Sequence, residues 1–239
     1  MIEKLRLGVF IDSSNIYHAA KKAGWTVDLL KLKQLFEHAG DLICIHYHVA
    51  VPSQNDTTYT NAKEYLDVIG AWVTVCAKPL KYLTDTKGRL TKKGDVDVEL
   101  VLDVVENLSD IDIAIVMSGD SDYQALDLHT RKQHVPVVFM GYKATMAWEL
   151  RLASHIFVER IRNCVERGNE NPDLSAGAAL VTLILAKTVA ESSARPSGVD
   201  KGEVPFVPPH VSSVQRKRKG PRGNGTTRGI FRGDYPSPI

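Results

Sequence analysis

Four aspartates stand at places in this 239-residue chain where a parallel α/β sheet would bring them to one point. Asp12 directly follows the first apolar run of the chain, and Asp120 and Asp122 follow the apolar run 113–117. Asp97 opens the helical stretch between those two runs. Carboxylate oxygens are the ligands that Mg²⁺ and Mn²⁺ prefer, and such an ion activates water and polarises phosphoryl groups. The four acids therefore predict a divalent metal site in an enzyme that acts on phosphates.

Two further polar side chains accompany the acids. Asn15 lies at the start of an expected helix, where its amide could orient a water molecule or a phosphate. Ser118 can hydrogen-bond the turn that carries Asp120. A simpler interpretation makes each acid a helix cap or a first-turn charge that complements a helix dipole. Because caps need no common meeting point, the two interpretations differ in whether the carboxylates converge.

Strand-length apolar runs alternate with helical patterns over most of the chain. The expected strands are 7–12, 42–50, 72–77, 111–117, 136–141 and 155–159, and the expected helices are 14–22, 28–38, 57–69, 95–108, 121–132 and 144–152. This alternation predicts an α/β fold with helices on both faces of a mainly parallel sheet. If the strand order is 3-2-1-4-5, Asp12 and Asp120 emerge side by side where the order reverses, which is where ligands bind in such sheets.

Basic residues gather in two parts of the chain. Residues 201–239 carry eight Lys or Arg and two acids, so this tail is +6, and residues 1–200 are −4 because the whole chain is +2. A basic tail favours a polyanionic partner, and RNA is the partner expected. Basic residues also crowd 78–94, whose 84–88 portion is expected to be a mobile loop; the alternatives are a solvated loop and a solubilising or nucleus-targeting tail. The candidate RNA contacts are Lys87, Arg89, Lys92, Lys93, Arg216, Lys217, Arg218 and Lys219.

The chain is expected to divide into three segments. Residues 1–163 form the α/β domain, residues 164–191 a helical extension, and residues 192–239, rich in Pro, Gly and basic residues, a disordered tail. The apolar face of the extension could cover the domain, a second copy in a homodimer, or nothing. Its longest apolar stretch, 176–186, looks too short to span a bilayer, so no membrane partner is expected. Three widely spaced cysteines and an N-terminus without a signal-peptide core favour a reducing, cytoplasmic setting.

Three motifs resemble those of the NYN domain family. Residues 9–15 (VFIDSSN) resemble its hydrophobic-I-D-x-x-N motif, residues 94–103 (GDVDVELVLD) its K-G-V-D-V-x-L-x-x-D motif, and residues 118–123 (SGDSDY) its S-G-D-x-D-F motif. The most similar branch is the LabA-like proteins, relatives of PIN-domain nucleases. The resemblance implies a PIN-like three-layer fold and a Mg²⁺- or Mn²⁺-dependent ribonuclease. It assigns metal roles to Asp12, Asp97, Asp120 and Asp122, with Asn15 and Ser118 in support.

Other side chains near these motifs have less defined roles. Asp95 is an addition to the middle motif and could be a further ligand or a surface acid. Asp103 matches a motif acid but lies about 240° around the helix from Asp97, so a structural or supporting role is expected. His46 and His48 alternate on an expected strand and share a face. No third metal ligand is evident for them, so packing against a helix is favoured.

The leading hypothesis is hydrolysis of RNA phosphodiester bonds by a metal-activated water. Some family members serve regulation, so a non-catalytic RNA-binding or regulatory protein is the alternative. A phosphatase-like hydrolase is a third hypothesis, because doubly wound sheets with an Asp after the first strand also carry aspartyl-phosphate chemistry. Against it, Asp12 has no second Asp two positions later, and no Thr follows soon after.

Overall fold

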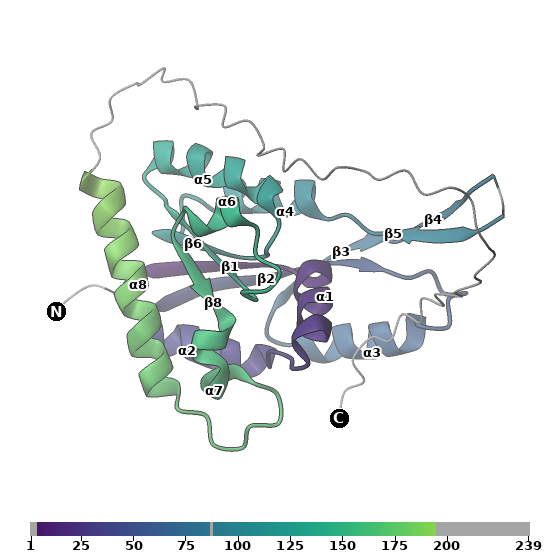
Figure 1. The fold of residues 1–239 in the computed structure, drawn as a ribbon, viewed down its shortest axis with the longest axis horizontal. Coiled ribbons are helices and arrows are strands. Elements are labelled where there is room, and N and C mark those ends of the chain that lie inside the picture. Colours follow the sequence, from purple (N-terminus) through teal and green to yellow (C-terminus); the bar gives the residue numbers. More distant parts are fainter. Residues whose placement is uncertain (1–3, 87, 195–239) are drawn as a thin grey trace, which may run out of the picture.

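A six-stranded sheet forms the centre of the computed structural model, which describes residues 4–86 and 88–194 (Figure 1). Each strand is parallel to its neighbours, in the order β3-β2-β1-β6-β7-β8. The bounds are β1 Arg6–Asp12, β2 Asp41–Val51, β3 Thr74–Pro79, β6 Ile113–Met117, β7 Val137–Gly141 and β8 His155–Phe157. The predicted order of the first five strands is confirmed, and β8 extends the sheet at its far edge.

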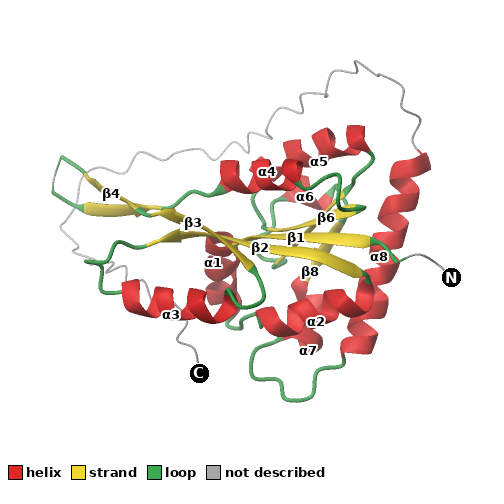
Figure 2. Cartoon of the chain, turned by 180° about the vertical axis from the view of Figure 1, so that it is seen from behind, coloured by secondary structure: helices red, strands yellow, loops and turns green. Residues whose placement is uncertain are grey.

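Helices cover both faces of the sheet and complete three layers (Figures 1 and 2). One face carries α4 Asp97–Glu106, α5 Gln124–Thr130 and α6 Trp148–Arg151. The other carries α1 Ser13–Ala23, α2 Leu29–Ala39, α3 Tyr59–Ile69 and α7 Arg162–Val165. Short 3-10 turns occur at Ser121–Tyr123, Arg131–Gln133 and Val158–Ile161. The predicted α/β class is therefore confirmed.

The central strand contributes to two separate cores. Leu7, Val9 and Ile11 pack on the side of α1 and α2, whereas Phe10 packs with α4 and α5. Successive side chains along a strand point to opposite faces, so both cores are filled only if the strand is apolar almost throughout. This requirement explains why the strands appear in the sequence as continuous runs. It also leaves the polar residue Asp12 at the very end of β1.

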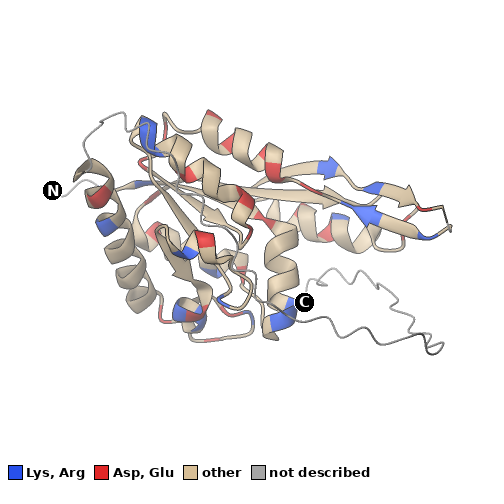
Figure 3. Cartoon of the chain, turned by 45° about the horizontal axis from the view of Figure 1, so that its top comes forward, with Lys and Arg blue, Asp and Glu red and all other residues tan. Residues whose placement is uncertain are grey.

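The basic segment 78–94 forms a hairpin. β4 Lys81–Thr84 and β5 Leu90–Lys93 pair antiparallel as a separate two-stranded sheet, so the loop predicted at 84–88 is largely the turn of this hairpin. The hairpin projects beyond β3 (Figure 1), and several positions along it are Lys or Arg (Figure 3). The sequence did not reveal these strands because they are short, exposed and lack apolar alternation.

Asp56 ties the hairpin to the domain. Its carboxylate pairs with the ammonium of Lys92 on β5 at 2.6 Å and accepts a hydrogen bond from the hydroxyl of Tyr82 on β4 at 2.7 Å. Burial raises the pKa of this carboxyl, but Lys92 and the hydrogen bonds from Thr58 and Tyr82 outweigh it and hold the pKa well below its usual range. Thr58 occupies the N-cap position of α3, but its side chain makes no capping hydrogen bond.

The last helix of the described chain is α8, Leu174–Ala194. It packs against α2: Val181 and Leu185 are buried there, and the hydroxyl of Thr182 donates to the carbonyl of Ala39 at 3.1 Å. The helix extends beyond the apolar stretch 176–186 at both ends, and by length and composition alone its 21 residues could cross a membrane. The expectation of no membrane partner therefore stays a prediction. Positions 192–194 are helical although composition predicts disorder there. The basic residues 216–219 lie outside the described residues.

Candidate metal centre

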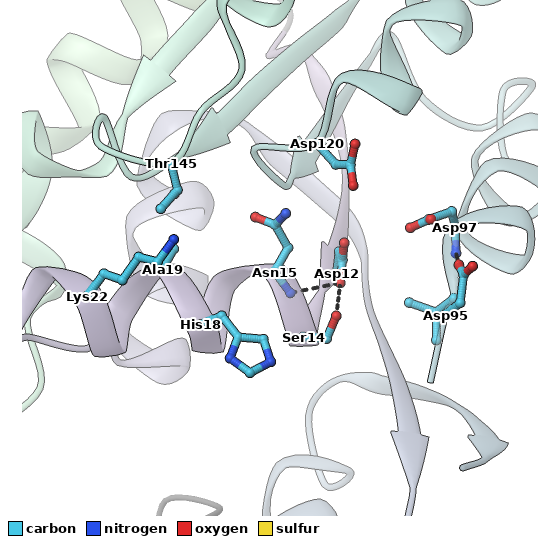
Figure 4. A pocket seen from close by; sticks show the side chains of 11 residues that line it. Asp12, Ser14, Asn15, His18, Ala19, Lys22, Asp95, Asp97, Asp120 and Thr145 are labelled. Atoms are coloured by element: carbon cyan, nitrogen blue, oxygen red, sulfur yellow. Dashed lines mark hydrogen bonds between the residues drawn. The ribbon is translucent and has the colours of Figure 1, made fainter. Parts of the chain in front are cut away.

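The predicted metal ligands converge beyond the carboxyl ends of β1 and β6, which lie side by side in the sheet (Figure 4). Asp12 ends β1, Asp120 follows β6 by three residues, and Asp97 is the first residue of α4, which packs on β1. Carboxylate oxygens of Asp97, Asp120 and Asp122 lie within 4.8 Å of one another. The acids thus meet at one point, as a shared site requires and separate caps do not.

Asp12 is the most buried of these acids, with 3% of its surface exposed. It caps α1, since Oδ1 accepts hydrogen bonds from the backbone N–H of Asn15 at 3.1 Å and the hydroxyl of Ser14 at 3.2 Å. Burial raises the pKa of Asp12; the hydrogen bonds oppose this shift, and the nearby charge of Asp120 adds to it. Asp12 is therefore a cap and a member of the acid cluster at once.

Ser118 and Tyr123 link the acids from inside the protein. The buried hydroxyl of Ser118 donates to Oδ2 of Asp12 at 3.2 Å and accepts the backbone N–H of Asp120 at 3.2 Å. The hydroxyl of Tyr123 donates to Oδ1 of Asp97 at 2.7 Å and lies 3.4 Å from Oδ2 of Asp12. Sequence reasoning named Ser118 but gave Tyr123 no role, although it is the last position of the third motif.

Asp97 lies in a crowded electrostatic environment. Burial raises its pKa to about 6, Asp95 and Asp12 add to the shift, and the hydrogen bond from Tyr123 opposes it. Asp95 lines the same cavity, accepts the backbone N–H of Asp97 at 3.3 Å, and has a lowered pKa because of its hydrogen bonds with Asp97. Converging carboxyls behave in this way when no cation separates them.

Asp12, Asp95, Asp97 and Asp120 line a cavity of about 390 Å³. One face of α1 forms a wall of this cavity with Asn15, His18, Ala19 and Lys22, and Thr145 lies opposite (Figure 4). Sequence reasoning found Asn15 but missed His18 and Lys22. Their spacing from Asn15, i+3 and i+7, would have placed them on its helix face.

Asn15 and Gly119 join α1 to the loop after β6. Oδ1 of Asn15 accepts the backbone N–H of Gly119 at 2.8 Å. A Cβ at position 119 would lie 2.8 Å from the carbonyl oxygen of Thr145 and 3.0 Å from Cα of Met146, so only glycine fits. The glycine of the third motif is therefore required by a close approach of two backbone segments, which sets the position of Asp120.

The donor set fits a hard divalent cation. All four predicted ligands offer carboxylate oxygens, and the cavity leaves room for the water ligands that Mg²⁺ and Mn²⁺ retain. Within residues 4–86 and 88–194, no Lys or Arg forms an ion pair with any of these four acids. A bound cation would supply the missing positive charge and relieve the repulsion that acts on Asp97.

The candidate RNA contacts differ in their surroundings. Lys93 is exposed on β5, two residues before Asp95. Lys92 is engaged by Asp56, and the guanidinium of Arg89 pairs with Asp85 at 2.7 Å although it is largely exposed. Lys87, like the basic residues of the tail, falls outside the part of the chain that the structure describes.

The two sheet histidines share a partner that the sequence did not reveal. Nδ1 of His46 and Nε2 of His48 lie 2.6 and 2.8 Å from Oδ2 of Asp103 on α4. The predicted packing against a helix is present, and this helix brings a carboxylate, not evident from the sequence, against both rings. Asp103 lies apart from the cluster around Asp97, as its helical angle requires.

The fold and the acids define a class: three-layer α/β proteins that carry a carboxylate cluster where the strand order reverses. Within this class, residues 6–162 match the NYN domain family, and the chain belongs to that family. NYN domains have a PIN-like fold and are generally nucleases.

The chain is also similar to one characterised sequence and to one solved structure. It is 26% identical over 182 residues to the low amplitude and bright protein LabA of Synechococcus elongatus, a match that covers 74% of this chain and 95% of LabA. A crystal structure of a protein of unknown function from Vibrio parahaemolyticus superposes with a TM-score of 0.51 at 22% identity and covers 66% of this chain and 94% of that protein. The second match shows the fold alone.

Proposed function

We propose that the protein is a ribonuclease that hydrolyses RNA phosphodiester bonds with Mg²⁺ or Mn²⁺ as its cofactor. The observation that carries this proposal is the convergence of Asp12, Asp97 and Asp120 on one open cavity, with a carboxylate oxygen of Asp122 within 4.8 Å of those of Asp97 and Asp120. Membership of the NYN family, whose domains are generally nucleases, supports a hydrolytic reaction. When bound, the ion would activate a water molecule and offset charge on the phosphate.

The chain's own residues would hold and orient the reactants. Asp97, Asp120 and Asp122 would bind the cation, while Asp12, fixed by Ser14 and Ser118, would bind it from the sheet side. The amide of Asn15 is held by Gly119 at the cavity wall, where it could orient water or phosphate. The ammonium of Lys22 and the ring of His18 lie along the same wall and would contact the RNA backbone, which positions a strand without reading its sequence.

Affinity for RNA would come chiefly from basic side chains outside the cavity. The chain runs from Lys93 at the end of β5 directly to Asp95 and Asp97, so an RNA strand lying along the hairpin would reach the acids. Contacts of this kind make binding fall as salt rises and give little sequence preference. The basic tail would add to the same electrostatic attraction, in the cytoplasmic setting that the cysteines favour.

The first test is cleavage of end-labelled single-stranded RNA with Mn²⁺, Mg²⁺ or EDTA. Asp120→Asn is expected to lose metal-supported cleavage without loss of fold, because it removes a charged ligand and keeps the side chain's shape. Asp110→Asn, which changes an exposed aspartate in a loop, is the matched control and should cleave normally.

Three results would overturn the proposal. Equal cleavage by wild type and Asp120→Asn at matched purity would show that the activity does not use these acids. Salt-sensitive RNA binding without turnover under any divalent ion would favour the regulatory, non-catalytic alternative. Hydrolysis of a small phosphate ester, but not of RNA, would favour the phosphatase-like one.

A further inference from the structure

A second group of metal-ligand side chains lies between the sheet and α4. It consists of His46 and His48 on β2, Cys76 on β3 and Asp103 on α4. His48 and Cys76 are directly paired across β2 and β3, and His46 lies two residues from His48, so all three share the face that α4 covers. None of the four lines the cavity that holds Asp12, Asp97 and Asp120.

The four side chains meet at one carboxylate oxygen. Oδ2 of Asp103 lies 2.6 Å from Nδ1 of His46, 2.8 Å from Nε2 of His48 and 3.8 Å from Sγ of Cys76. One ligand atom each from His46, Cys76 and Asp103 lies within 4.8 Å of the other two. His48 is not part of that group but reaches the same carboxylate oxygen, and an ion with bonds of about 2.0–2.3 Å would replace the short contacts of Asp103 with the two imidazole nitrogens.

We propose that these four residues form a second metal site, specific for Zn²⁺ and distinct from the acid cluster. Two imidazoles, a thiolate and a carboxylate are the ligands that Zn²⁺ takes in four-coordinate sites, whereas Mg²⁺ and Mn²⁺ favour oxygen alone. The charges also balance, because one thiolate and one carboxylate neutralise a dication while both imidazoles stay neutral. A neutral centre suits this location, where the side chain of His48 is only 2% exposed and that of Asp103 17%.

A neighbouring group prepares one ligand for this role. Nδ2 of Asn107 donates to Oδ1 of Asp103 at 3.0 Å, which turns the other oxygen toward the histidines. Such outer hydrogen bonds orient metal-binding carboxylates.

A purely hydrogen-bonded triad of Asp103 with the two histidines is the competing explanation. It gives Cys76 no function, since Sγ lies 3.8 Å from Asp103 and 4.0 Å from the carbonyl of Thr74, at the outer limit of a sulfur hydrogen bond. Nδ1 of His48 is buried without a partner within the described residues under either explanation, so it does not distinguish them. Under the metal interpretation, one ion ties β2, β3 and α4 together and thereby holds the helix that begins with Asp97.

Cobalt is the probe that separates the two explanations, because Co²⁺ substitutes for Zn²⁺ and its bond to a thiolate gives an intense charge-transfer absorption. Metal-free full-length protein is titrated with Co²⁺ and then with Zn²⁺. We expect this absorption to saturate at one Co²⁺ per chain and to disappear when Zn²⁺ displaces it. Cys76→Ser, a small change that keeps the fold, should abolish the band, and His46→Ala should weaken Co²⁺ binding at least tenfold.

Two control variants keep the test specific. Cys164→Ser changes a thiol in the opposite core, and Asp120→Asn changes the acid cluster; both should retain the band at full strength. Absence of the band in the wild type, its survival in Cys76→Ser, or its loss in Cys164→Ser would overturn the proposal and leave the hydrogen-bonded triad. The readout is independent of RNA cleavage, so it decides this site whatever the outcome for the proposed ribonuclease.

Discussion

The hydroxyl of Tyr123 should control how the acid cluster binds metal as pH changes. It donates to Oδ1 of Asp97 at 2.7 Å, and this bond opposes the burial that raises the pKa of Asp97 to about 6. A hydrogen bond to a charged group contributes about 1.5–3 kcal/mol, and the lower end suits half-buried Asp97. Since about 1.4 kcal/mol corresponds to one pKa unit, Tyr123→Phe should raise the pKa of Asp97 to roughly 7.

The effect on Mn²⁺ affinity follows from the sign of this shift. The cation binds the ionised carboxylate, so affinity rises with pH through the pKa of Asp97. A shift of one unit lowers the ionised fraction from about 0.9 to about 0.5 at pH 7, and from about 0.5 to about 0.1 at pH 6. We therefore expect Tyr123→Phe to weaken Mn²⁺ binding about twofold at pH 7, about fivefold at pH 6, and hardly at all at pH 8.

Calorimetric titration of the metal-free protein with Mn²⁺ at the three pH values measures this dependence. Tyr142→Phe is the matched control, because it removes a buried hydroxyl that donates to the carbonyl of Trp25 at 3.1 Å, in the other core. A loss of affinity that is the same at all three pH values would refute the reasoning, since it would come from general distortion of the site. An equal loss in Tyr142→Phe would refute it too.

Three further substitutions test the frame around the site. Asp56→Ala should lower the free energy of unfolding in urea by about 2 kcal/mol at pH 7, less than for a fully buried pair because Lys92 is 40% exposed. Because the pKa of Asp56 is lowered in the folded protein, this difference should shrink as pH falls below about 3.8; a constant difference would contradict the ion pair. Gly119→Ala should cost about 1–3 kcal/mol in thermal unfolding and also weaken Mn²⁺ binding, because Cβ would press on the backbone at Thr145; unchanged Mn²⁺ affinity would contradict its role in placing Asp120. Leu185→Ala should cost about 2–5 kcal/mol, since Leu185 is 1% exposed between α8 and the domain, whereas an unchanged unfolding midpoint would mean that α8 does not dock there.

The sheet was predictable because both of its faces are covered. Strands such as β1 and β6 must be apolar almost throughout, so they stand out as runs, and polar residues at their ends are easily noticed. Asp12 and Asp120 could thus be placed from the sequence once the strand order was assumed. Lys22 follows from Asn15 by helix spacing, whereas Tyr123 could not be placed as readily, because its hydroxyl meets Asp97 only through the tertiary fold.

The hairpin and the histidine cluster escaped prediction for two different physical reasons. The side chains of β4 and β5 are mostly exposed, so the two strands leave no apolar pattern in the sequence. Their position depends instead on contacts with Asp56, which lies far from them along the chain. The cluster depends on register: a shift of β3 by one residue against β2 would turn Cys76 to the opposite face and away from His48. Asp103 meets both histidines only because α4 crosses above this register. Asp103 lies on the face of α4 that points away from Asp97, and this orientation places its carboxylate beside two imidazoles and a thiol. The cobalt titration tests whether these four side chains bind metal.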